Sequence, residues 1–136
     1  MNFFKRVLAV IAGVAIGLTL VMAGDFGSGI LAPFLKEIDY TDKQKIAEAM
    51  TRVPLSAFLV MLLGYSVGAF LGGLVATLIS GREASRPAIT VGIILTVGNI
   101  FNQMSIPHPM WFSVVSTLIY IPFAWLGYRL MSKPSE

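Results

Sequence analysis

The sequence contains no cysteine, a single histidine and few charged residues. Only 12% of its 136 residues are charged, whereas soluble domains average about 25%. The missing cysteine excludes disulfides, cysteine-ligated metal sites and thiol catalysis. The net charge of +3 is spread over the ends and loops. It forms no basic patch with interleaved aromatic residues, so we expect no nucleic-acid partner.

Common catalytic motifs are also missing. The sequence has no HExxH zinc motif, no GxxxxGK[ST] phosphate loop and no paired carboxylates. His108 has no second histidine with which to bind a metal, and no Ser-His-Asp set of convincing spacing. No acidic or basic residue lies in the middle of an apolar run, where proton- and ion-coupled transporters need one. We therefore predict no enzymatic centre, no cofactor and no metal.

Four charge-free runs organise the chain, at 7–24, 53–81, 87–106 and 109–128. Each is close to or above the roughly 20 apolar residues that span a bilayer. None alternates with period two, so helices rather than barrel strands are expected. The prediction is an all-α integral membrane protein, a bundle of four transmembrane helices in a single domain, 1–136. The helices are expected at about 4–24, 53–81, 87–106 and 109–129, with an outer loop at 25–52.

The first run has a second interpretation. A basic start, an apolar core and "VMAG" also resemble a signal peptide that is cleaved after Ala23. We expect the run to be retained as a span. Cleavage would leave three spans in the same orientation.

Basic residues predict the orientation of the spans. The N-terminus, the 82–86 loop and the C-terminal tail carry six basic and two acidic residues, whereas the 25–52 segment carries four basic and five acidic ones. Both termini are therefore expected to be cytoplasmic. Aromatic residues gather at membrane interfaces, and four lie near the ends of the last span: Trp111, Phe112, Trp125 and Tyr128.

The outer loop contains a helix signal. Thr41 and Gln44 have the spacing of a capping box, and Asp42 complements the dipole of a helix that starts there. Apolar residues follow one face at spacings of three and four: Ile46, Ala49, Met50 and Val53. We predict a short amphipathic helix at about 42–52, on the outer membrane surface or against the bundle. The alternative is a simple turn that leads into the second span.

Small residues form a stripe along the second span. They recur every four residues at Gly64, Gly68, Gly72, Ala76 and Ser80, and the first span has a shorter version at Ala9, Gly13 and Gly17. Membrane helices associate through close packing, which small residues allow. The stripe therefore predicts a packing surface (a glycine zipper). Its partner is either the other stripe of the same chain or a second subunit.

A few polar residues fall at the outer ends of the spans. Asn99, Asn102 and Gln103 share one face of the third span, and His108 follows it. Asp25 is expected at the same outer level, and Tyr65 lies deeper in the second span. Amides in lipid need partners. They either tie helices together, which we favour, or line a polar pocket with Asp25, Tyr65 and His108.

Three segments, "AVIAGV", "GYSVGAFLGG" and "IPHPMWF", resemble in this order a group of small bacterial four-span membrane proteins. The similarity covers most of the chain. It implies the fold and a bacterial inner-membrane location, but no function, because the group has no assigned activity. The group's acidic residue late in the first span and its proline eight residues later are similar to Asp25 and Pro33. A histidine often stands between them, where this chain has Gly29.

We expect the protein to act as an accessory or self-assembling interaction subunit, packed through its glycine stripes. Its partners would then be membrane lipids and either further copies of itself or a larger membrane complex. The alternative is a binder or carrier of a small polar or amphipathic molecule, which would use the outward-facing amide and histidine pocket.

Overall fold

A computed structural model describes residues 3–82 and 84–132, without the side chain of Lys36. The described residues form helices and no strand. The long helices are α1 (Phe3–Leu31), α3 (Leu55–Ile79), α4 (Arg86–Ser105) and α5 (Met110–Met131). All four are long and apolar enough to cross a membrane, which confirms that part of the prediction. The chain has the architecture of a multi-pass membrane protein.

The first helix continues past its predicted end. α1 runs on to Leu31 and includes Asp25, whereas the sequence placed the end at residue 24 and the start of the loop at 25. The helix accommodates this acidic residue because the Tyr65 hydroxyl donates a hydrogen bond to the Asp25 carboxylate. The connection to α3 is correspondingly shorter. It begins with a single 3-10 turn, η1 (Pro33–Glu37).

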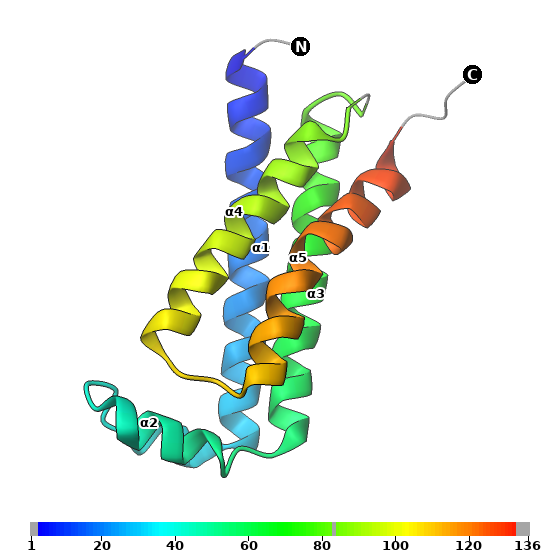
Figure 1. Cartoon of the computed structure of the whole chain (residues 1–136). Helices are drawn as coiled ribbons and strands as arrows, with labels where there is room; N and C mark the ends of the chain where they lie inside the picture. The colour runs from blue at the N-terminus through cyan, green and yellow to red at the C-terminus, as the bar shows by residue number, and fades with distance from the viewer. Residues whose placement is uncertain (1–2, 83, 133–136) are drawn as a thin grey trace.

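A short helix, α2 (Lys43–Met50), lies across the end of the bundle opposite the two termini (Figure 1). Its N-cap is Asp42 rather than Thr41: the Asp42 carboxylate accepts from the backbone amides of Gln44 and Lys45, while the Thr41 hydroxyl donates to Asp39. Ile46, Ala49 and Met50 are its buried residues.

The glycine stripe of α3 packs against α1 of the same chain. A Cβ atom added to Gly72 would lie 2.6 Å from the carbonyl oxygen of Gly13, and one added to Gly68 would lie 2.7 Å from that of Gly17. One added to Gly64 would lie 2.7 Å from the Cα of Gly24. Close approach of this kind is what small residues permit. The remaining small residues of the two stripes are also buried: Ala76 and Ser80 in the stripe of α3, and Ala9 in that of α1.

A second glycine contact, which the sequence analysis missed, joins the other side of α3 to α5. A Cβ atom on Gly73 would collide with the backbone of Ala124, and one on Gly127 would collide with the backbone of Phe70. α3 therefore lies between α1 and α5, in backbone contact with both.

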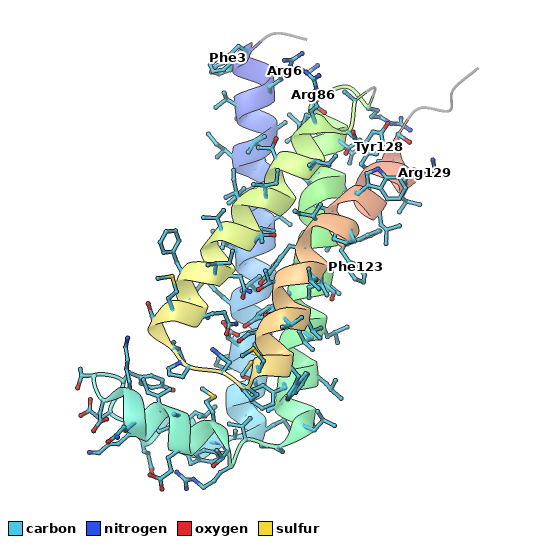
Figure 2. The ribbon with its side chains drawn as sticks, in the orientation of Figure 1. Phe3, Arg6, Arg86, Phe123, Tyr128 and Arg129 are labelled. Atoms are coloured by element: carbon cyan, nitrogen blue, oxygen red, sulfur yellow. The ribbon has the colours of Figure 1, made fainter. Side chains whose placement is uncertain are left out.

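Basic side chains gather at the end of the bundle where the termini lie. Arg6, Arg86 and Arg129 are all at this end (Figure 2). The turn between α3 and α4 is here, with Gly81 and Arg82 at positive φ, and Arg82 Nε donates to the carbonyl oxygen of Met131. α2 and the 106–109 connection lie at the opposite end (Figure 1). The segments that the sequence analysis compared for charge thus lie at opposite ends of the molecule.

Candidate functional site

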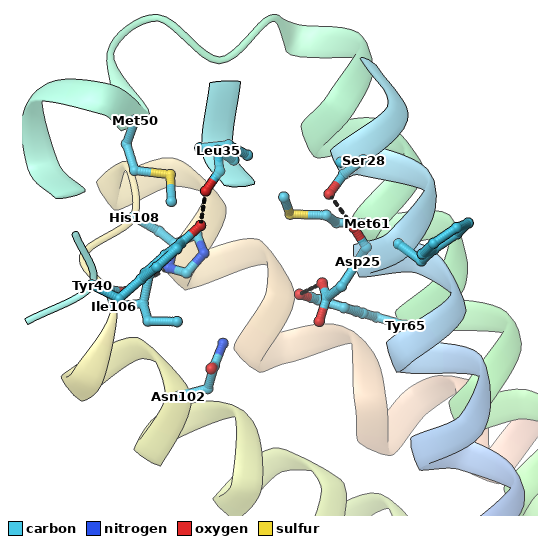
Figure 3. Close-up of a pocket in the computed structure, with 12 residues that line it drawn as sticks. Asp25, Ser28, Leu35, Tyr40, Met50, Met61, Tyr65, Asn102, Ile106 and His108 are labelled. Atoms are coloured by element: carbon cyan, nitrogen blue, oxygen red, sulfur yellow. Dashed lines mark hydrogen bonds between the residues drawn. The ribbon is translucent and has the colours of Figure 1, made fainter. Parts of the chain in front are cut away.

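A cleft of about 450 Å³ opens at the α2 end of the molecule (Figure 3). α1, α3 and α4 form its walls, and the segment from η1 to α2 covers it. Its lining combines polar with apolar side chains: Asp25, Phe26, Ser28, Gly29, Leu35, Tyr40, Met50, Met61, Tyr65, Asn102, Ile106 and His108. Ligand pockets in proteins commonly measure about 300–1,000 Å³ and are mostly apolar, with a few placed polar groups.

The main polar feature of the cleft is the pair formed by Asp25 and Tyr65. The Tyr65 hydroxyl donates to Asp25 Oδ1 over 2.8 Å. Tyr65 is 2% exposed, and its ring stacks on Tyr120 at a centroid distance of 5.8 Å. Asp25 itself is exposed. The rigid tyrosine therefore orients a carboxylate whose second oxygen stays open to the cleft.

Asn102 lies across the cleft from this pair (Figure 3). In the described part of the chain, no side chain or backbone group hydrogen-bonds to its amide. Its side chain is only partly buried, and it is not among buried polar groups that lack a hydrogen-bond partner. Asn102 is thus available to a bound molecule.

The other two amides of α4 have a different role. Asn99 Nδ2 donates to Ser116 over 3.1 Å and to Thr117 over 3.3 Å. Gln103 accepts from the Ser113 hydroxyl over 2.8 Å. Both amides connect α4 to α5. The predicted cluster is therefore divided: Asn99 and Gln103 tie helices together, and Asn102 faces the cleft.

His108 belongs to the connection between α4 and α5. Its Nδ1 donates to the carbonyl oxygen of Ile106 over 2.7 Å, because a carbonyl oxygen can only accept. The ring stacks on Phe112 at a centroid distance of 5.1 Å. Burial lowers the pKa of His108 below its ordinary value, although the bond to Ile106 opposes this. The neutral ring then keeps Nε2 as an acceptor.

The cover of the cleft was not predicted from the sequence. Leu35 and Met50 belong to this cover and are buried, as is Met61 on α3. The Tyr40 hydroxyl donates to the carbonyl oxygen of Leu35 over 2.7 Å, which folds residues 35–40 back over the cleft. The sequence signal was present in the apolar segment "FGSGILAPFL" and in the buried face of α2, but neither indicates where the loop folds.

A smaller cavity of about 210 Å³ adjoins the cleft on the other side of the Asp25–Tyr65 pair. Both spaces share Asp25, Tyr65 and Asn102. The smaller one, here called the deep cavity, reaches toward the middle of the bundle. Its other lining residues are Leu18, Val21, Leu95, Gly98, Asn99 and Tyr120.

Among the described residues, no three histidine, cysteine, aspartate or glutamate side chains come together to hold a metal ion. Comparison with family models, with curated proteins and with solved structures gave no match.

Proposed function

We propose that this chain is a membrane protein that binds or carries a small amphipathic molecule in the cleft. The observation that supports this is the cleft itself, in which an oriented carboxylate and an unbonded amide face each other across a space lined by methionine and aromatic side chains. Lipid-embedded polar groups are costly unless partnered. A bound molecule would supply the partners that the described protein does not.

The cleft favours this function over the interaction subunit that the sequence analysis put first. The stripe of Gly64, Gly68 and Gly72 is in backbone contact with α1, so it offers no free surface to a second copy. The contact between Gly73 and Ala124 occupies the opposite side of α3. Assembly with other subunits would use other surfaces.

The proposal includes a location and a direction. The excess of basic residues at the terminal end favours a bacterial inner membrane with both termini in the cytoplasm. The cleft lies at the opposite end, so it would open toward the outside. The protein would have no enzymatic centre and would take its ligand from the outer leaflet or from the external solution.

The test uses two neighbouring amides of α4. Wild type, Asn102→Leu and Gln103→Leu are purified in native-lipid nanodiscs without detergent, and the retained small molecules are identified by mass spectrometry. We expect wild type and Gln103→Leu to retain a defined molecule beyond bulk lipid, and Asn102→Leu to lose it.

Melting temperatures provide the control. Gln103→Leu loses its bonds to α5, and side-chain hydrogen bonds between membrane helices average about 0.6 kcal/mol. Asn102→Leu should melt like wild type, because it loses no bond within the described chain. The same set of retained molecules in wild type and a folded Asn102→Leu would count against the cleft as a binding site.

A further inference from the structure

We infer that the ligand of the cleft carries a protonated amine, and that Asp25 binds this group. This inference rests on the proposed function, since it names the chemical class of the bound molecule. Hydrogen-bonding capacity, charge and shape support it independently.

The donors that line the cleft are nearly all used inside the protein. The Tyr65 hydroxyl donates to Asp25, the Tyr40 hydroxyl to Leu35 and the Ser28 hydroxyl to the backbone carbonyl of Asp25. The ring N–H of His108 donates to Ile106. Among the described lining side chains, only the Asn102 amide keeps free donors.

The acceptors, in contrast, stay free. A carboxylate has two oxygens with about four acceptor positions, and Asp25 uses one oxygen for Tyr65. The Asn102 carbonyl accepts from no described group, and neutral His108 has Nε2 in addition. A molecule bound here therefore meets mostly acceptors, so its own polar group must be a donor.

The charge of the site is negative, which also favours a ligand with a protonated amine. Among the described lining side chains, Asp25 is the acidic one, and none is a lysine or arginine. Aromatic rings also line the cleft in Phe26, Tyr40 and Tyr65, and the faces of such rings attract cations. An alcohol would satisfy the hydrogen bonds alone, whereas an ammonium group also satisfies the charge. An anion would be repelled.

The shape of the site indicates what the rest of the ligand must be like. Asp25 and Tyr65 stand between the cleft and the deep cavity. The walls of the deep cavity are largely apolar, with Leu18, Val21 and Leu95. A cationic head at Asp25 can thus have an apolar tail beside it in either space. This arrangement fits an alkyl amine better than a small hydrophilic cation.

The experiment compares three probes with the same tail. Octylammonium, octanol and octanoate are titrated into the protein in nanodiscs of neutral lipid, with empty nanodiscs as the background. Saturable binding is measured by calorimetry for wild type, Asp25→Asn, Tyr65→Phe and Glu48→Gln. Glu48 is exposed, lies on α2 at the same end of the molecule and does not line the cleft, so its variant controls for loss of a negative charge.

We expect octylammonium to bind wild type and Glu48→Gln alike and more tightly than the other two probes. Asp25→Asn should weaken it by about tenfold or more, because hydrogen bonds to charged groups are strong. Tyr65→Phe keeps the carboxylate but loses the hydroxyl that orients it, so it should weaken octylammonium binding less than Asp25→Asn does. If Asp25→Asn does not fold, the preference of wild type for octylammonium over octanol decides the test.

The outcomes separate the inference from the proposed function. Equal binding of octanol and octylammonium to wild type, or a folded Asp25→Asn that binds octylammonium as tightly as wild type, would overturn the amine and leave a ligand cleft. Preferential binding of octanoate would overturn the amine as well. If no probe shows saturable binding, both the amine and the cleft as a site for amphipathic molecules are wrong.

Discussion

Replacement of Gly68 by alanine tests whether backbone contact between α1 and α3 holds the bundle together. The new Cβ would lie 2.7 Å from the carbonyl oxygen of Gly17, about 0.7 Å inside the 3.4 Å at which ordinary contact begins, and 3.2 Å from the Cβ of Leu20. A backbone carbonyl in a helix cannot rotate away, so α1 must move. Overpacking of this kind costs about 1–3 kcal/mol.

Helix propensity acts in the opposite direction. Alanine is better than glycine in a helix interior by about 1 kcal/mol, so the net loss at Gly68 is about 2 kcal/mol at most. Gly98 is the matched control, because no atom lies within 4 Å of the position of its Cβ. Gly98→Ala should therefore stabilise the protein by about 0.5–1 kcal/mol. The two substitutions are chemically identical, and their effects on the free energy of unfolding should have opposite signs.

The assay is reversible unfolding in mixed micelles, with the fraction folded followed by helical circular dichroism as the denaturing detergent increases. The free energy of unfolding should fall for Gly68→Ala and rise for Gly98→Ala. An equal gain at both positions would refute the packing argument, since it would mean that Gly68 faces lipid.

Three other predictions follow from the same geometry. Gly73→Ala should destabilise the protein more than Gly68→Ala in the same assay, because its Cβ would collide with the backbone of Ala124; a smaller loss would contradict the α3–α5 contact. Burial lowers the pKa of His108 in the folded state, so the unfolded chain binds that proton more tightly. Stability should then be constant above the ordinary pKa of about 6.5 and fall as the pH drops below it, and His108→Gln should flatten this dependence of the melting temperature; an unchanged slope would exclude the histidine. Single cysteines at Lys43 and Ser132 should be labelled by an impermeant reagent on intact cells at position 43 only, and the reverse pattern would invert the topology.

The long helices could be predicted because length and hydropathy are local properties of the sequence. The end of α1 could not, because the group that stabilises Asp25 inside a helix is Tyr65, forty residues away in the sequence. A charge in an apolar run looks like a boundary until its partner is known. Gly24, the last residue of the predicted helix, was missed as part of the α1 contact surface because it follows Gly17 by seven residues and so breaks the spacing of four.

The pocket could be predicted only in part, because shared spacing does not specify how a helix is rotated. Asn102 and Gln103 are about 100° apart around α4, and only the packed position of α4 decides which one faces α5. Gln103 bonds to Ser113 and Asn102 lines the cleft. The cover depends on a loop that folds back through Tyr40 and Leu35, a contact that no spacing in the sequence indicates.

The most direct test of the cleft as a binding site is the NMR signal of the Asn102 side-chain amide. The ¹⁵N-labelled protein in nanodiscs is titrated with octylammonium, octanol and octanoate in turn, and the side-chain amides of Asn102 and Gln103 are followed together. A molecule in the cleft should shift the Asn102 signal saturably with at least one probe and leave Gln103, which is bonded to α5, unmoved. An Asn102 signal that stays still with all three probes, or that moves only together with Gln103, would contradict the account.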